Sequence, residues 1–172
     1  MSMVCRGRFC HACQIAVLSC AFFVISSVIA DESDRSFSQA VSAYEKSDYH
    51  TARQEFERLA KQGQAEAQRF LGYMYDKGLG VPRDYNKAIS WYRKAAEQKD
   101  SAAQYHLGLK YANGHGVPKD QKQAYIWFAI SFNNGYELAA DPLRVLNKSL
   151  STYDRQEALE DVVQQMEEYG NK

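Results

Sequence analysis

The chain has little proline, which interrupts helices, and little cysteine, which can form disulfides: 3 prolines and 4 cysteines among 172 residues. All the cysteines lie near the start, at Cys5, Cys10, Cys13 and Cys20. If that leader is removed, the remaining chain has no disulfide to stabilise it in an oxidising compartment, so packing alone must hold the fold. Cys10 and Cys13 have the spacing of a redox or zinc pair, but no second pair accompanies them, so we interpret them as leader residues.

The sequence also has no excess of either charge, because 21 Lys and Arg residues balance 21 Asp and Glu residues. Nucleic-acid-binding domains normally carry a basic excess, so we expect no nucleic-acid partner. The chain shows no acidic tail either. Aromatic residues make up 13% of the sequence, which is enough for a packed core and argues against a disordered chain.

Residues 1–30 have the layout of a secretory signal peptide. Arg6 and Arg8 supply a positive start, residues 15–30 contain no charged side chain, and small residues precede the acidic Asp31. This apolar run is shorter than the roughly 20 residues of a membrane-spanning helix. We therefore expect an exported domain over residues 31–172, with no membrane insertion after cleavage. An uncleaved leader kept as an anchor is the alternative.

Two consecutive stretches, residues 65–100 and 101–136, carry nearly the same sequence in register. A constant shift of 36 residues superposes small, polar, aromatic and loop positions alike. Matched pairs include Ala67 and Ala103, Gln68 and Gln104, Gly72 and Gly108, Asp84 and Asp120, and Trp91 and Trp127. A period in this range is typical of a solenoid built from stacked helix pairs.

The first half of each unit predicts a helix that packs closely on another helix. Ala67, Leu71 and Tyr75 recur every four residues and mark one helical face. Gly72 lies beside that face, and an exposed glycine there would cost about 1 kcal/mol relative to alanine. We therefore expect Gly72 to let a second helix approach.

The residues that connect the first helix of each unit to the second predict caps for both helices. Gly78 and Gly114 suit a left-handed C-terminal cap, which glycine adopts freely. Asp84 and Asp120 suit the N-terminal cap of the following helix, where a carboxylate accepts from free backbone N–H groups. Each unit is therefore expected to be a helix hairpin.

A further helix pair is expected upstream, over residues 37–64. Its second helix aligns at the same shift of 36 residues, but its connection is five residues shorter. Ser36 with Gln39 offers a start for its first helix, and Ser101 with Gln104 offers a capping box in the same place two units later.

Downstream of residue 137 the repeat pattern degrades. Asp141 and Pro142 predict the cap and first position of a short helix, and Ser151 with Asp154 predicts the start of a last one. That last helix has a polar side and an apolar stripe, which is typical of a helix that caps a solenoid. The stripe consists of Leu159, Val162, Val163 and Met166.

Each unit follows the pattern A-x-A-Q-x-x-L-G-x-x-Y-x-x-G-x-G-V-P-x-D-x-x-K-A-x-x-W, which resembles the Sel1-like repeat, a relative of the tetratricopeptide repeat. Residues 65–100 match it nearly throughout, residues 101–137 match it through Trp127, and residues 37–64 are more similar to a plain tetratricopeptide unit. The resemblance implies an all-α, right-handed solenoid of antiparallel helix pairs with a C-terminal capping region over residues 138–172. It also implies an adaptor or scaffold in protein–protein contacts, often in periplasmic or secreted bacterial proteins. A cysteine-rich subgroup bridges its helices with disulfides, and its properties do not carry over to this chain.

Candidate partner-binding residues lie on the first helix of each unit, opposite the packing stripe. They are Arg69, Phe70, Tyr73 and Lys77 in one unit and Tyr105, His106, Leu109 and Asn113 in the next. A purely solvated face would be polar, yet this one is rich in aromatics. The side chains either pack against the second helix of the preceding unit or line a concave groove, where aromatic residues and arginine are typical anchors. Some of them could do both.

No arrangement of residues in the chain is typical of catalysis. The glycines around Leu79 lack the preceding strand of a phosphate-binding loop, and His50, His106 and His115 lack the spacing of a helical metal site. We therefore expect no enzyme activity, no metal and no cofactor, and a protein or peptide partner bound through the concave face. The alternatives are a secreted effector that engages host proteins and a periplasmic hydrolase acting on cell-wall material. The hydrolase would need two carboxylates about 5–10 Å apart in one cleft.

Overall fold

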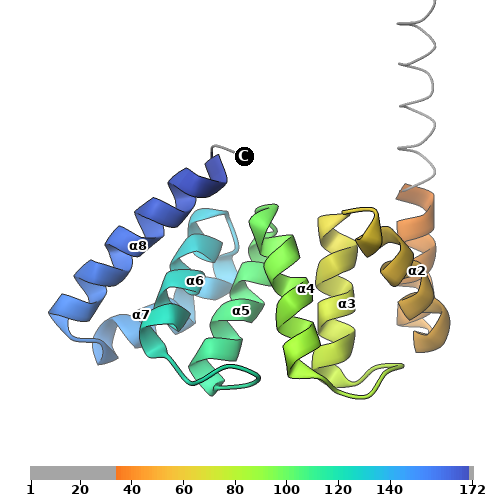
Figure 1. Ribbon diagram of the computed structural model, residues 1–172, viewed down its shortest axis with the longest axis horizontal. Coiled ribbons are helices and arrows are strands. Elements are labelled where there is room, and N and C mark those ends of the chain that lie inside the picture. Colours follow the sequence, from red (N-terminus) through yellow and green to blue (C-terminus); the bar gives the residue numbers. More distant parts are fainter. Residues whose placement is uncertain (1–33, 171–172) are drawn as a thin grey trace, which may run out of the picture.

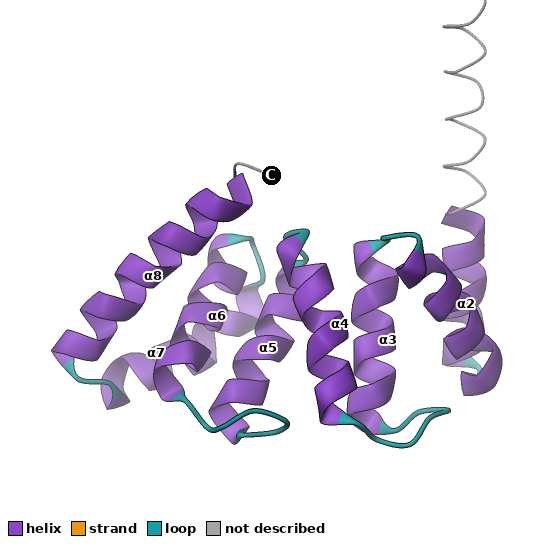
Figure 2. Cartoon of the chain, in the orientation of Figure 1, coloured by secondary structure: helices purple, strands orange, loops and turns teal. Residues whose placement is uncertain are grey.

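The computed structural model describes residues 34–170, and every regular element within them is a helix (Figure 2). The helices follow one another along the long axis of the molecule, from the segment at residue 34 to α8 (Figure 1). This arrangement confirms the predicted all-α solenoid. The expected leader, residues 1–30, lies outside the described residues.

Three helix pairs form the body of the solenoid. They are residues 34–45 with α2 (Tyr49–Lys61), α3 (Ala65–Lys77) with α4 (Tyr85–Glu97), and α5 (Ser101–Asn113) with α6 (Gln121–Asn133). A 3-10 turn (Glu137–Ala139), α7 (Ala140–Ser149) and α8 (Thr152–Gly170) follow. From α2 to α6 each helix packs against the next, whereas α7 and α8 both pack on α6.

The predicted caps are present in both full-length hairpin loops. Gly78 and Gly114 are left-handed, with φ of 74° and 72°, and each donates its N–H to a carbonyl of the last helical turn. Asp84 accepts from the N–H of Lys87 at 3.0 Å, and Asp120 accepts from the N–H of Gln123 at 3.0 Å. The first pair has a shorter connection, as predicted. Residues 46–48 connect its helices, whereas residues 78–84 connect α3 to α4, so the connection is shorter by four residues rather than the predicted five.

Two predicted helix starts are wrong by a few residues. Asp100, rather than Ser101, caps α5, because its carboxylate accepts from the N–H of Ala103 at 2.7 Å. The preceding residue, Lys99, has a φ of 65°, which ends α4 and leaves Asp100 extended in the capping position. Residue 36 lies inside the first helix, which already includes residue 34.

The start of α7 also differs from the prediction, whereas the start of α8 is confirmed. The 3-10 turn leads directly into α7 at Ala140 with no side-chain cap, and Asp141 instead pairs with Arg144 at 3.0 Å. Before α8, the hydroxyl of Ser151 accepts from the N–H of Asp154 at 3.1 Å and donates to its carboxylate at 2.6 Å.

An aromatic ring lies over the glycine of each full unit. A Cβ atom at Gly72 would come within 2.9 Å of the Tyr92 ring, and one at Gly108 would come within 2.7 Å of the Phe128 ring. Both rings are buried. The predicted close approach at Gly72 is therefore confirmed. The ring of the second helix occupies the space that a side chain on the glycine would need.

A buried glutamine ties successive helix pairs together. The Gln68 amide donates to the carbonyl of Ala60 at 3.1 Å, which satisfies a backbone group at the end of α2. Gln98, at the end of α4, donates to the Gln68 side-chain oxygen at 2.8 Å. The next unit repeats both bonds, at 3.1 and 2.9 Å, with Gln104, Ala96 and Asn134. The same residue thus joins its own hairpin to the preceding one.

Candidate functional site

The eight predicted partner-binding residues lie on α3 and α5, and we call them the first-helix face. Lys77 and Asn113 are exposed, and the other six are half-buried. The face is therefore neither a purely solvated surface nor a closed core.

Phe70 and Arg69 make their main contacts within the fold. The Phe70 ring stacks on Phe56 of α2, with centroids 4.8 Å apart, so it packs against the preceding pair. Arg69 donates to the carboxylate of Asp100 at 3.0 Å and lies 4.8 Å from the Phe70 ring. These two residues link α3 to the preceding pair and to the cap of α5. For Phe70 the geometry favours the packing role.

His106 occupies in α5 the place that Phe70 occupies in α3, 36 residues earlier. Its imidazole stacks on Tyr92 of α4 with centroids 5.0 Å apart. The rings of Tyr73 and Tyr105 make edge-to-face contacts with the imidazole, each with its centroid 5.8 Å from the imidazole centroid. Burial lowers the pKa of His106 from its usual 6.5 to about 4, although the Asp76 carboxylate opposes that shift. The ring is therefore neutral at physiological pH and acts as an aromatic packing element.

Tyr73, Tyr105 and Leu109 are partly exposed while they contact the core cluster formed by α4 to α8. Tyr105 packs on Phe128 at 5.5 Å between ring centroids, so its position is set by the fold. The Lys77 ammonium lies 5.6 Å from the Tyr73 ring. This part of the face offers ordered aromatic surface beside an exposed cation.

Two further tyrosines extend the row of rings, and sequence reasoning did not include them. Tyr136 lies 5.2 Å from Tyr105, in the segment after α6. Tyr44, on the first helix, is close enough to Tyr73 that burial and the Tyr73 hydroxyl raise the pKa of Tyr44. Tyr44 lies outside the two copies with the 36-residue register, and Tyr136 is the last residue of the second copy, where the first copy has Asp100. The comparison of copies therefore gave no signal for either tyrosine.

A buried ion pair between Lys110 and Asp76 was also missed. It joins α5 to α3, and both side chains are only 6% exposed. The Lys110 ammonium also lies 5.1 Å from the Tyr85 ring. The repeat contained a signal, because Lys110 replaces Met74, and Asp76 stands where the next unit has Ala112. Each charged residue stands where the other copy has an apolar one, and the two charges are opposite, which indicates an ion pair.

The described residues show no centre for metal chemistry. Between residues 34 and 170, no three His, Cys, Asp or Glu side chains are grouped so that they could hold a metal ion. Over the same residues, no helix combines the length and the apolar character needed to cross a membrane. Glu160 and Glu167 border one shallow hollow, but they are exposed on a single helix. This placement differs from the two sides of a cleft that a glycosidase pair requires.

Comparison with known proteins identifies the repeats. Residues 65–100 and 101–136 each match the sequence profile of the Sel1 repeat. Proteins with this repeat generally act as scaffolds in protein–protein interactions and bind protein partners. Among curated protein sequences, none matches this chain.

Solved structures share the fold over most of the described chain. A protective antigen from uropathogenic Escherichia coli, c5321, is 31% identical over 80% of this chain and 30% of its own, with a TM-score of 0.75. A Sel1 repeat protein from Oxalobacter formigenes is 33% identical over 63% of this chain and 44% of its own, with a TM-score of 0.60. Cysteine-rich protein B of Helicobacter pylori is 26% identical over 64% of this chain and 93% of its own, with a TM-score of 0.51. The chain thus spans less than half the length of the first two.

We predict that Asp76→Ala lowers the free energy of unfolding by about 3–5 kcal/mol, because Lys110 is then buried without a counter-charge. Adding Lys110→Met recovers most of the loss, because each of the two positions then holds the apolar residue found at the equivalent position of the other copy, Met74 for Lys110 and Ala112 for Asp76. Urea denaturation of both variants measures this. A double variant as unstable as the single one would show that the charge imbalance is not the cause.

We predict that His106→Phe makes stability less dependent on pH. The folded-state pKa of about 4 lies below the ordinary 6.5, so the unfolded chain binds more protons between these values. Stability due to this group is therefore complete above about pH 6.5 and is lost as the pH falls towards 4, by about 1–2 kcal/mol between pH 7 and pH 5. Denaturation at both pH values should show that loss in the wild type and a smaller loss in the variant. Equal losses in the two proteins would contradict the assignment.

Proposed function

We propose, from the premise that this chain is a Sel1-like repeat protein, that it binds a protein or peptide partner through the first-helix face, which Tyr44 and Tyr136 extend. The observation that carries the proposal is the row of half-buried rings on that face. Tyr73 and Tyr105 are held by the core on one side and reach solvent on the other.

Rings held in this way suit recognition. Aromatic side chains are enriched among the residues that dominate interface energies. Because Tyr73 and Tyr105 are already packed against the core, little rotamer freedom remains to be lost when a partner binds. Lys77 and Asn113 are exposed beside them and can supply polar contacts at the rim.

We propose that the protein works outside the cytoplasm, in the periplasm or beyond the bacterial cell, as an adaptor without catalysis. The support is the sequence of residues 1–30, with its positive start, apolar run and small residues before Asp31. An effector that engages host proteins would use the same surface and differ only in its destination.

Replacing Tyr73 and Tyr105 together with serine should weaken partner capture at least tenfold, because each truncated anchor costs about 1–2 kcal/mol of binding. Capture from an envelope fraction, quantified by mass spectrometry, measures the loss for any protein that the wild type enriches. Tyr153→Ser is the matched control, because Tyr153 is 75% exposed on α8 and lies outside the face.

Circular dichroism separates loss of binding from loss of fold. A double variant that keeps its helical signal but loses the enriched protein, while Tyr153→Ser retains it, supports the proposal. Retention of the partner by the double variant contradicts it, and unfolding of the double variant assigns both rings to the core instead.

A further inference from the structure

On α8, the last described helix, fewer apolar side chains are buried than are exposed. Ala158 and Val162 are 0% and 4% exposed and belong to the core cluster. By contrast, Leu159 is 50%, Val163 is 57% and Met166 is 38% exposed. The stripe that the sequence assigns to a cap is therefore split, and its outer part faces solvent. A helix that caps a solenoid ordinarily has a polar outer face, and the exposed apolar residues of α8 depart from that pattern.

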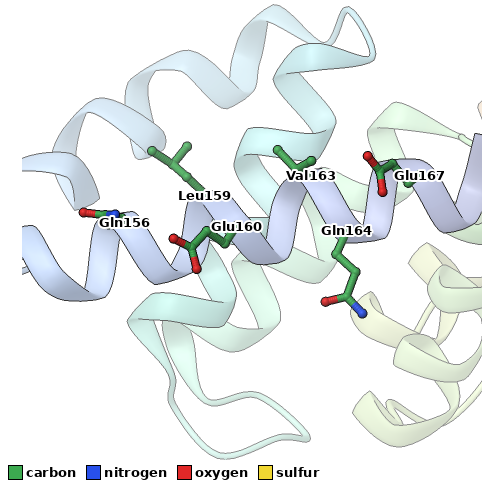
Figure 3. A pocket seen from close by; sticks show the side chains of 6 residues that line it. All are labelled: Gln156, Leu159, Glu160, Val163, Gln164 and Glu167. Atoms are coloured by element: carbon green, nitrogen blue, oxygen red, sulfur yellow. The ribbon is translucent and has the colours of Figure 1, made fainter.

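The exposed residues form one continuous strip, with acidic residues along it. Leu159, Val163 and Met166 follow the i, i+4, i+7 spacing of a single helical face. Figure 3 shows Leu159 and Val163 on successive turns of α8, with Glu160 and Glu167 beside them. These side chains, with Gln156 and Gln164, line a shallow hollow. We call this surface the α8 outer face.

Within residues 34–168, α8 is attached to the solenoid mainly through a different side of the helix. On the opposite side of α8, Lys122 of α6 pairs with Glu157 at 2.9 Å and with Asp161 at 3.5 Å. Together with Ala158 and Val162, these pairs attach the helix to the solenoid. On the outer face, the sulfur of Met166 accepts from the Asn133 amide of α6 at 3.6 Å, whereas Leu159 and Val163 keep half or more of their surface exposed.

The charge of the face identifies what it can bind. The sequence of α8 up to Glu168 contains six acidic residues and one basic residue, Arg155. Arg155 is directed to α7, where it donates to the carbonyl of Asn147 at 3.1 Å. Among the described residues, neither Glu160 nor Glu167 forms an ion pair with a basic side chain. An occupant must therefore supply both apolar contacts and positive charge.

A second copy of the chain fits this requirement poorly. Two α8 outer faces packed on each other would bring Glu160 and Glu167 against the same carboxylates of the other copy, with no basic residue between them. Like charges placed together across an interface cost several kcal/mol and suppress that pairing. The face therefore favours a different partner.

We propose that the α8 outer face docks an amphipathic helix of another protein, with apolar residues at i, i+3 or i+4 and i+7 and lysine or arginine on its flanks. Helix-on-helix packing already joins each helix to the next from α2 to α6, and an apolar helical strip is a common way to bind a helix. This docking site is separate from the first-helix face and does not rest on the function proposed for it.

The test uses a fluorescent 18-residue peptide of leucine and lysine in an amphipathic helical pattern, and a matched peptide in which glutamate replaces each lysine. Fluorescence anisotropy with the purified protein should show the lysine peptide binding at least tenfold more tightly than the glutamate peptide. Leu159→Gln with Val163→Gln should weaken binding at least tenfold. Glu160→Gln with Glu167→Gln should weaken it at least threefold and reduce its salt dependence, because the lost contacts are exposed charge pairs.

Controls separate this site from the rest of the surface. Tyr73→Ser with Tyr105→Ser should leave peptide binding unchanged, and thermal unfolding of the α8 variants should match the wild type because the altered side chains are exposed. Equal binding of the two peptides, or wild-type affinity in the Leu159 and Val163 variant, would overturn the proposal. Sedimentation showing a dimer that this variant dissociates would also overturn it, by assigning the face to a second copy.

Discussion

The solenoid depends on an aromatic ring of a second helix, that of Tyr92, which two helix pairs share. Tyr92 fills the space left by Gly72 of its own unit and stacks on His106 of the next. Phe128 repeats the contact with Gly108, and Phe56 stacks on Phe70 of the following pair. Because Tyr92 belongs to both packings, neither of these two hairpins can bury its apolar side without the other, which is the physical basis of a stacked repeat protein.

The surface available for binding follows from that packing. The first helix of each unit must present one side chain to the shared ring, and this draws Phe70 and His106 partly inward. Residues one turn away, such as Tyr73 and Leu109, are supported by the same core but stay partly exposed. The chain thus presents ordered aromatic surface. On α8, Leu159 and Val163 remain exposed, because no element among the described residues covers them.

The sequence predicted the elements that both copies repeat and missed those that only one copy carries. Gly72, Gly78 and Asp84 recur at a fixed shift, and each has a local physical role that can be read without coordinates. The pairing of Lys110 with Asp76 crosses from α5 to α3, so only a three-dimensional arrangement brings the charges together. The residues of the first-helix face that pack could not be separated from those proposed to bind a partner. Periodicity predicts on which side of a helix a residue lies, but not how deeply its side chain is buried.

Hydrogen exchange in a Tyr92→Leu variant tests the shared ring most directly. Leucine keeps an apolar side chain but cannot both fill the space at Gly72 and stack on His106. If the ring couples the units, amides in both α3 and α5 should exchange at least tenfold faster than in the wild type, which corresponds to about 1.4 kcal/mol of lost local stability. Faster exchange confined to α3 and α4, with α5 unchanged, would contradict the account.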